Sequence, residues 1–278
     1  MIRKTFSLSP ITYHLSPITM NYRLTIQYDG TDFHGWQMQG AGERTVQGEL
    51  MAALSLLEGR AVVVNGAGRT DAGVHAVGQV ASVELRREIG PEKLCAAING
   101  NIAPDVRVIA AETVDENFHA RYSARGKTYR YRIFNARYAS PFLLRYTHTD
   151  ARRFDIERMQ ACARLFLGEH DWTAFSAAQT DVQTRVRALT QLEVRESWSD
   201  VGRAPLIEIT ASADGFLRYM VRSIAGTLLE VGRGRMDAAQ VVRALRSRER
   251  SLAGATAPAK GLTLIEVHYD KQQVAPPG

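Results

Sequence analysis

Residues 66–76 contain the side chains best suited to chemistry in this sequence. They read Gly-Ala-Gly-Arg-Thr-Asp-Ala-Gly-Val-His-Ala and combine three glycines with one carboxylate, Asp71, and one guanidinium, Arg69. Glycine lets the backbone approach a partner closely, because it has no side chain to clash. Strand-like runs at 61–64 and 77–83 lie on either side. We therefore expect the charged pair at the end of a strand, where active sites are often built.

Two other interpretations of residues 66–76 are open. The segment fits a surface hairpin in which Asp71 only closes a turn. A phosphate-binding glycine loop is the weaker alternative, since the segment lacks the GxxxxGK[ST] spacing and no helix follows it. The local pattern alone does not separate the hairpin from an active site.

A basic and aromatic stretch runs from residue 117 to 149 without one Asp or Glu. Its seven basic and eight aromatic residues are Arg121, Arg125, Lys127, Arg130, Arg132, Arg137 and Arg145, and Phe118, Tyr122, Tyr129, Tyr131, Phe134, Tyr138, Phe142 and Tyr146. Cations neutralise phosphates, and aromatic faces stack on unpaired bases at ~1–3 kcal/mol each. The stretch favours nucleic-acid binding. The alternative is a solvated basic edge strand with tyrosines in the core.

Strand alternation divides this stretch between two faces. In the strand expected over 129–134, Tyr129 and Tyr131 share one face, while Arg130 and Arg132 share the other. We expect one of these faces to pack in the core and the other to form a charged surface.

Arginines four residues apart occupy a long helix expected over 216–231. Arg218 and Arg222 then lie on one helix face. Arg222 follows Met220 and Val221, so we expect it to be partly buried and to need a carboxylate partner. Asp71 is the candidate for that partner. His75 and His119 are candidate acid–base groups as well, but the expectation for these lone histidines is a structural role.

Composition and charge restrict the class of protein. The chain has 278 residues, of which 45% are apolar, and its length favours two domains. No apolar run approaches the roughly 20 residues that cross a bilayer. Cys95 and Cys162 have no metal-site spacing, which favours buried reduced thiols and a cytoplasmic protein. The net charge is +6, with nine basic and thirteen acidic residues over 21–124, but twenty-four and sixteen over 125–278.

The order of elements predicts an α+β fold. Strand, helix, strand, strand, helix and strand follow one another in the first half, and the second half repeats this theme. We expect two ferredoxin-like (RRM-like) domains, at 21–124 and 125–270, whose antiparallel sheets join around a central catalytic cleft. Residues 1–20 and 271–278 are excluded from the fold, and Trp36 in the aromatic loop 33–37 is either a base platform or part of the core.

The expected elements are located by periodicity and by caps. Thr45 and Gly59 bound a first helix, and a second is expected over 92–98. Later helices begin after Asp155 and Asp237. The remaining strands are expected at 22–28, 106–110, 189–195, 205–213 and 262–269.

Three segments together resemble one family. GRTDAGVHA at 68–76, YDGTDFHGWQ at 28–37 and ARYSARGKTYRYRIFN at 120–135 are similar to the tRNA pseudouridine synthase A family, and the resemblance extends over almost all of 21–270. It implies a homodimer that grips the anticodon arm of tRNA and isomerises uridines 38, 39 and 40. It implies no cofactor and no metal.

The resemblance also implies roles for individual residues. Asp71 falls on the catalytic aspartate, and Tyr129 on the tyrosine that stacks on the target base and is the candidate to take the proton from C5. Arg222 falls on the arginine that pairs with the aspartate, and Arg69 on the residue implicated in extruding the base. We expect substrate contacts also from Arg121, Arg125 and Lys127.

The chemistry of uridine isomerisation is compatible with these residues. A carboxylate can serve as nucleophile or base, and a guanidinium keeps it charged. Tyrosine, with an ordinary pKa of about 10, would need help from its surroundings to act as a base. A non-catalytic RNA-binding protein gives Asp71 no function. Aspartyl hydrolase and glycosidase chemistry would want a second carboxylate, which the segment does not offer.

Overall fold

The computed structural model describes residues 19–40, 42–178 and 182–270. The first half contains β1 (Met20–Tyr28), α1 (Val46–Glu58), β2 (Val64–Gly66), β3 (His75–Leu85), α2 (Pro91–Asn99) and β4 (Val106–Val114). The second half contains β5 (Gly126–Phe134), β6 (His148–Thr149), α3 (Ile156–Ala163), β7 (Gly168–Asp171), β8 (Val186–Ser199), β9 (Ala204–Ala213), α4 (Met220–Gly232), α5 (Ala238–Ser247) and β10 (Leu262–His268).

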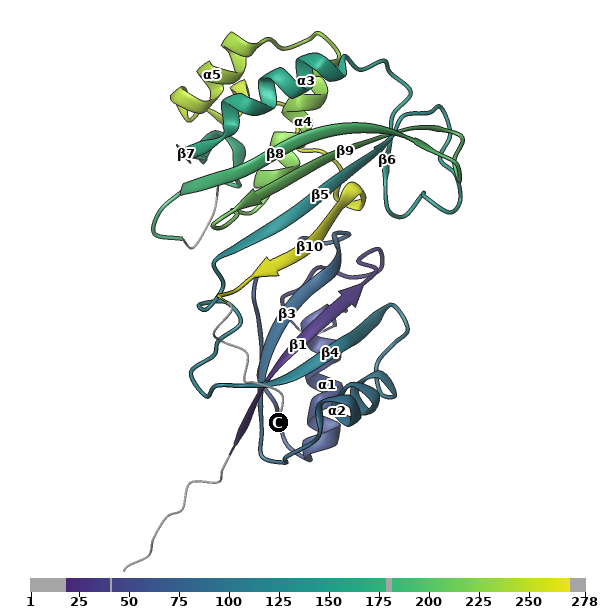
Figure 1. Cartoon of the computed structure of the whole chain (residues 1–278), viewed down its shortest axis with the longest axis vertical. Coiled ribbons are helices and arrows are strands. Elements are labelled where there is room, and N and C mark those ends of the chain that lie inside the picture. Colours follow the sequence, from purple (N-terminus) through teal and green to yellow (C-terminus); the bar gives the residue numbers. More distant parts are fainter. Residues whose placement is uncertain (1–18, 41, 179–181, 271–278) are drawn as a thin grey trace, which may run out of the picture.

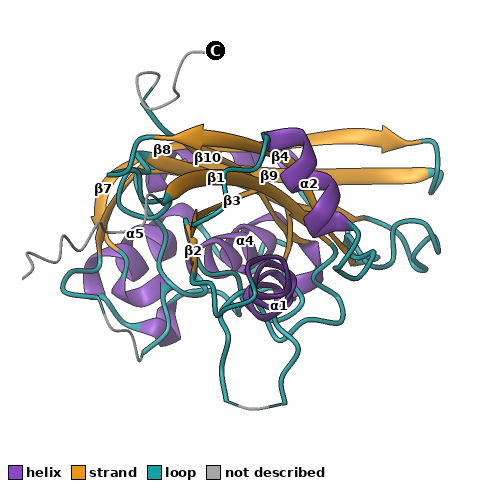
Figure 2. Cartoon of the chain, turned by 90° about the horizontal axis from the view of Figure 1, so that it is seen from below, coloured by secondary structure: helices purple, strands orange, loops and turns teal. Residues whose placement is uncertain are grey.

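These strands form one large sheet, mostly antiparallel. Its order is β4-β1-β3-β10-β5-β9-β8-β7, with β2 paired to β3 and β6 paired to β5. Figure 1 shows the first half below and the second half above, with β3 and β10 meeting between them. Helices α1, α4 and α5 lie on the same side of the sheet (Figure 2). The expected α+β class is confirmed.

A short parallel pairing joins the two halves. Thr263 and Leu264 of β10 pair with His75 and Ala76 of β3, whereas β10 runs antiparallel to β5. Because β3 and β10 run in the same direction, the loops that precede them meet at one edge of the sheet. The glycine-rich segment 67–74 precedes β3, so this pairing determines where it lies.

Local signals explain where several helices begin. The Thr45 side chain accepts a hydrogen bond from the Gly48 amide at 3.3 Å, and Gly59 ends α1 with φ 68°. Such a cap satisfies an amide that the first helical turn leaves without a partner. Asp155 caps α3 in the same way, and Asp237 forms a capping box at α5.

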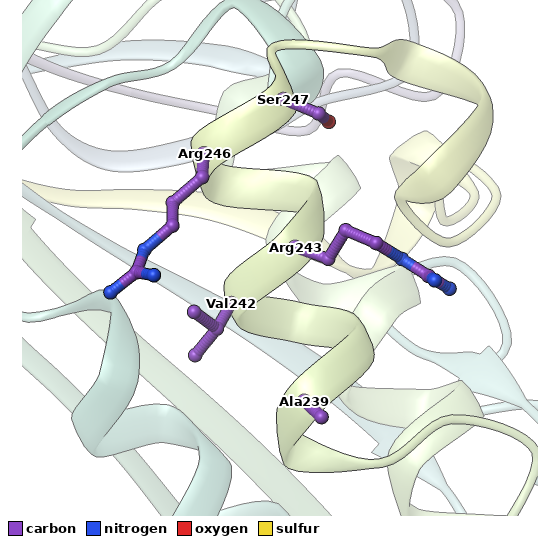
Figure 3. Close-up of a pocket in the computed structure, with 5 residues that line it drawn as sticks. All are labelled: Ala239, Val242, Arg243, Arg246 and Ser247. Carbon is purple, nitrogen blue, oxygen red and sulfur yellow. The ribbon is translucent and has the colours of Figure 1, made fainter.

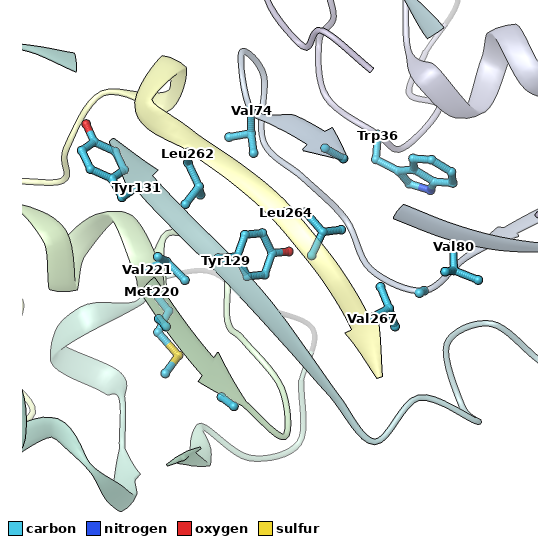
Figure 4. Packing of buried hydrophobic residues seen from close by; sticks show 14 of the residues in the cluster. Trp36, Val74, Val80, Tyr129, Tyr131, Met220, Val221, Leu262, Leu264 and Val267 are labelled. Atoms are coloured by element: carbon cyan, nitrogen blue, oxygen red, sulfur yellow. The ribbon is translucent and has the colours of Figure 1, made fainter. Parts of the chain in front are cut away.

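The core on the helical side contains the strand faces predicted to be apolar. Tyr131 and Ile133 are fully buried and Tyr129 is 6% exposed. Figure 4 shows Tyr129 and Tyr131 on β5 beside Leu262 and Leu264 of β10. Trp36 is 1% exposed, and a side chain at Gly66 would come within 2.4 Å of its ring. Of the two expectations for Trp36, the core location is correct.

The start of α4 differs from the prediction. We expected the longest helix over 216–231, but α4 begins at Met220 and has 13 residues, the same number as α1. Tyr219 has φ 68°, a left-handed conformation that interrupts a helix. Phe216 and Arg218 therefore lie before α4.

The strand boundaries also differ in two places. We expected a strand at 61–64, but the strand in this region, β2, begins only at Val64 and extends to Gly66. Met20, which we excluded from the fold, is the first residue of β1 and pairs with Leu85. The expectations for residues 1–18 and 271–278 lie outside the described residues. Cys95 and Cys162 are free, but only Cys162 is buried, and Cys95 is half-buried.

Candidate active site

The segment 67–74 connects β2 to β3 and lies against the aromatic loop that follows β1. Trp36 donates its amide hydrogen to the Thr70 carbonyl at 3.1 Å, and the Gly73 amide donates to Phe33 at 3.3 Å. A Cβ at Gly30 would lie 2.0 Å from the Val74 carbonyl oxygen. Segment 67–74 and the loop after β1 therefore form one structural unit, in which glycine permits close contact between the two backbones.

Two buried polar side chains form hydrogen bonds with the same segment, 67–74. The Tyr28 hydroxyl lies 2.8 Å from the Thr70 hydroxyl, and the Gln79 amide donates to the Gly68 carbonyl at 3.0 Å. Burial raises the pKa of Tyr28 to about 12, so this phenol is neutral. Since Gln79 is fully buried and bonded, these contacts fix the path of the loop rather than bind a solvent-exposed ligand.

Asp71 and Arg222 are brought together from opposite halves of the chain. Arg222 Nη1 donates to Asp71 Oδ2 at 3.1 Å, and Arg222 Nε donates to the Ala257 carbonyl at 2.7 Å. The two side chains are 20% and 16% exposed. Burial raises the pKa of Asp71 above the ordinary value of a carboxyl, although Arg222 and Arg218 act in the opposite direction.

A second guanidinium, which the sequence reasoning did not place at the site, faces the other oxygen of Asp71. Arg218 Nε lies 3.7 Å from Asp71 Oδ1, and its side chain is 61% exposed. Both Arg218 and Arg222 lie over the ring of Tyr219. The four-residue spacing of the arginines was the available signal, although Arg218 is not part of the helix.

Tyr129 lies close to this carboxylate but is poorly suited to be ionised. Its ring meets Phe216 edge-on at 5.1 Å between centroids. Burial raises its pKa, and the neighbouring Tyr28 and Asp71 raise it further. To act as a base, Tyr129 would need surroundings that lower its pKa, and these surroundings raise it. Among the described residues no hydrogen-bond partner of its hydroxyl is found.

Arg69 and Lys127 lie on the loop and beside it. Arg69 is exposed and donates from Nε to Gln37 at 3.1 Å. The Lys127 side chain lies against Gly68, where a Cβ would approach its Cε to 3.0 Å. Burial, together with Arg121 and Arg187, lowers the pKa of Lys127. This part of the site is therefore electropositive.

Other members of the basic stretch are engaged elsewhere. Arg125 pairs with Asp270 at 2.7 Å on the surface. Arg132 Nε lies 2.9 Å and Arg130 Nη1 3.7 Å from Glu208 of β9, on the strand face opposite Tyr129. The predicted charged surface is thus partly neutralised, and it is not the face that carries Tyr129.

His75 and His119 form hydrogen bonds with backbone groups, which fits the structural role expected for them. His75 is 3% exposed, accepts from the Gly30 amide at Nδ1 and lies 2.9 Å from the Arg145 carbonyl through Nε2. His119 Nδ1 accepts from the Arg121 amide at 3.1 Å. Burial lowers the pKa of His75, and Asp29 counteracts this only in part.

Two hollows lie away from Asp71. One, of ≈ 420 Å³, borders α5, where Arg246 and Val242 extend to one side of the helix and Arg243 to the other in the view of Figure 3. The other, of ≈ 450 Å³, is lined by residues including Arg130 and Arg132. Neither is lined by Asp71, Tyr129, Arg222 or Arg69, although His75 lines the second. In the described ranges, no three His, Cys, Asp or Glu side chains form a metal-binding group, and no helix has the length and apolarity to cross a membrane.

Fold and site together define the class: an α+β enzyme with a single carboxylate on a glycine loop, held by arginines from the other half of the chain. A family model described as tRNA pseudouridine synthase matches residues 24–123 and 162–270. The chain belongs to the tRNA pseudouridine synthase family and is an isomerase that acts on tRNA.

Similar proteins match over nearly their whole length. A tRNA pseudouridine synthase A of Acetivibrio thermocellus is 41% identical over 249 residues, covering 90% of this chain and 99% of that protein. The one of Ruminiclostridium cellulolyticum is 42% identical over 247 residues, covering 89% and 98%. Among solved structures, a chain of a Cbf5-Nop10-Gar1 complex covers 87% of this chain and 57% of its own at 12% identity. Its TM-score of 0.31 is too low to say anything about the fold.

Proposed function

We propose that this enzyme converts uridine to pseudouridine at positions 38, 39 and 40 in the anticodon stem-loop of tRNA, with Asp71 as its essential residue. The observation that carries the proposal is the placement of Asp71. It lies on the glycine loop, 3.1 Å from Arg222 and 3.7 Å from Arg218. Its charge also contributes to the raised pKa of Tyr129. No other carboxylate makes a salt bridge to either arginine in the described parts of the chain.

Isomerisation breaks the bond from N1 to C1′, rotates the base and forms a bond from C5 to C1′. The C5 proton is released, and N1 gains a proton, so no other reactant is consumed. The ionised carboxylate of Asp71 acts as nucleophile or base in this sequence. Arg222, fixed by the Ala257 carbonyl, favours the ionised form and orients it.

The flipped base needs a surface to receive it, and we assign this role to Tyr129. A base that leaves its stack in the duplex is commonly held between aromatic or apolar side chains. Because burial raises the pKa of Tyr129, stacking by the neutral ring suits this residue better than removal of the C5 proton by a phenolate. We also assign displacement of the base to Arg69, which is exposed on the loop two residues before Asp71.

Phosphate contacts follow from the cations beside the loop. We propose that Lys127 and Arg121 bind the RNA backbone next to Gly68, and that Arg125 contributes less because Asp270 pairs with it. Cytoplasmic location and a homodimer are further proposals, supported by the resemblance and by the reduced cysteines. Light scattering of the purified protein, at twice the mass of one chain, would support the dimer.

The test is release of tritium from tRNA that carries 5-tritiated uridine, without metal or nucleotide. Wild type should release tritium, and Asp71→Asn should not, while both bind tRNA. Asp200→Asn, an exposed carboxylate between β8 and β9, is the matched control and should keep wild-type activity. Substrates with a single uridine at 38, 39 or 40 then test the positions.

Each result has a clear meaning. Binding without release by wild type would favour an RNA-binding module without this activity on the tRNAs tested. Wild-type activity of Asp71→Asn would place the chemistry on another residue. Release from uridines outside the anticodon stem-loop alone would refute the assigned positions. For Tyr129, stacking predicts that Tyr129→Leu weakens tRNA binding by roughly five- to a hundredfold and that Tyr129→Phe does not.

A further inference from the structure

Tyr219 combines two locally unfavourable features at a residue that faces the active site. Its φ of 68° is left-handed, a conformation that costs an ordinary side chain about 1–2 kcal/mol. It is also the N-cap of α4 but makes no side-chain capping bond, where Ser, Thr, Asp or Asn is preferred. Strain of this kind persists where the surrounding structure imposes it, and it concentrates at functional sites.

The ring of Tyr219 contacts both guanidiniums that face Asp71. Cζ of Arg218 lies 4.8 Å and Cζ of Arg222 lies 5.1 Å from the ring centroid. The Tyr219 hydroxyl also accepts a hydrogen bond from Arg218 Nη2 at 3.0 Å. A cation over an aromatic face is attracted to it, more strongly when water is excluded. One ring therefore holds two cations that would otherwise repel each other.

We propose that Tyr219 is a positioning residue, which holds Arg218 and Arg222 against the two oxygens of Asp71. With its left-handed backbone, Tyr219 keeps its ring within 5.1 Å of the guanidinium carbons of both Arg218 and Arg222. Arg222 has a second anchor, the Ala257 carbonyl at 2.7 Å. Arg218 is 61% exposed, and its side-chain contacts among the described residues are Tyr219 and Asp71. Arg218 therefore depends most on the ring.

The proposal rests on the proposed role of Asp71 and deepens it. The charged groups that face Asp71 are Arg218 and Arg222, and Tyr129 on β5 is neutral near it. Both arginines lower the pKa of Asp71, against burial. If the ring is removed, the guanidiniums are held less firmly, and the pKa of Asp71 should rise by about half a unit to one unit.

The test compares Tyr219→Asn with Tyr219→Phe. Asparagine accepts the left-handed conformation and suits an N-cap, so Tyr219→Asn should fold with an unchanged or higher melting temperature. It should nevertheless lower kcat/KM about three- to thirtyfold and shift the acid limb of the rate profile to higher pH. Tyr219→Phe keeps the ring and should stay within about threefold of wild type. Arg248→Asn is the control for asparagine at a left-handed residue, because Arg248, at the C-terminal end of α5, has φ 63°.

A readout that does not need activity separates this proposal from the proposed function. The pKa of Asp71 is measured by carbon-13 NMR of labelled aspartate in the free enzyme, assigned with Asp71→Asn. A higher pKa in Tyr219→Asn than in wild type supports the proposal, whatever the substrate. An unchanged pKa with an unchanged rate profile overturns it, as does an equal loss in Tyr219→Phe.

Inactive wild-type protein would instead count against the proposed function alone. Should Tyr219→Asn fail to fold, Tyr219→His replaces it, since histidine also tolerates the left-handed region. Its imidazolium form would repel both arginines, so an acid limb like that of wild type in Tyr219→His also overturns the proposal.

Discussion

Removing Asp71 and removing Arg222 should have very different effects on the free energy of unfolding, although the two residues form one ion pair. Burial raises the pKa of Asp71 despite two arginines. A carboxyl with a raised pKa binds its proton more tightly in the folded than in the unfolded state, so ionised Asp71 lowers the free energy of unfolding at pH 7. Asp71→Asn removes that charge and leaves Arg222 with the Ala257 carbonyl. We expect stability to stay within about 1 kcal/mol of wild type or to increase, because sites built for activity are often not optimal for stability.

Arg222→Gln should be clearly destabilising. Breaking a fully buried pair by removing one partner costs about 3–5 kcal/mol. Asp71 and Arg222 are 20% and 16% exposed, and Arg218 remains near Asp71, so we expect about 2–3 kcal/mol at pH 7. The cost is complete above the pKa that Asp71 has without Arg222, which is higher than in wild type because Arg222 lowers that pKa. It is lost as the pH falls from that pKa to the wild-type pKa, because protonated Asp71 needs no cation.

The assay is urea unfolding of wild type, Asp71→Asn, Arg222→Gln and the double variant, at pH 7 and at lower pH. In the Asp71→Asn background, Arg222→Gln should lose most of its cost, and the double-mutant cycle then gives a coupling energy. Arg195→Gln removes an exposed pair with Glu193 and should cost under about 1 kcal/mol. Additive effects, or a loss in Asp71→Asn as large as in Arg222→Gln, would refute the reasoning.

Three further predictions concern the loop, its histidine and the cations. Gly30→Ala should destabilise by about 1–3 kcal/mol and lower activity, because its Cβ would lie 2.0 Å from the Val74 carbonyl oxygen. Burial lowers the pKa of His75, so the stability it provides is present above pH ~6.5 and is lost as the pH falls toward the folded pKa; His75→Gln should flatten this slope in unfolding measurements. Lys127→Gln should reduce the slope of log K for tRNA binding against log salt concentration by about 1, the value for one phosphate contact. Arg132→Gln should leave this slope unchanged, because Arg132 is already paired with Glu208.

Matched controls make these three measurements decisive. A Cβ at Gly40 meets nothing within 4 Å, so Gly40→Ala should leave melting temperature and activity unchanged, and a Gly30→Ala protein as stable as Gly40→Ala would contradict the packing argument. An acid slope of wild-type size in His75→Gln would assign that slope to other groups, such as His148, whose pKa burial also lowers. Equal salt slopes for Lys127→Gln and Arg132→Gln would contradict the assignment of the RNA-binding face.

Local sequence signals predicted the elements well where the cause is local. Thr45, Asp155 and Asp237 cap helices as expected, since a cap depends on residues within one turn. Alternation along β5 correctly placed Tyr129 on a buried face. The predicted start of α4 was wrong, because Tyr219 adopts a left-handed conformation, which is uncommon for tyrosine and which no nearby residue type signals.

Long-range pairing explains what the pattern could not predict about the charges. Arg130 and Arg132 form part of a basic stretch in sequence, yet Glu208, which partly neutralises their charge, comes from β9. The partner of Arg125 is Asp270, 145 residues later in the chain. A count of charges along the sequence therefore overstates the basic surface. Lys127 remains at the loop because strand β5 passes beside Gly68.

The parallel pairing of β3 and β10 explains why the site forms where it does. Parallel strands begin at the same edge of a sheet, so the loop before His75 and the loop before Leu262 must meet there. Gly73 and Ala259 are accordingly adjacent, with 3.4 Å from a Cβ at Gly73 to that of Ala259. Arg222 bonds to both loops, to Asp71 on the first and to Ala257 on the second. In a sheet that is otherwise mostly antiparallel, this parallel pairing between the two halves thus brings the carboxylate to its arginine.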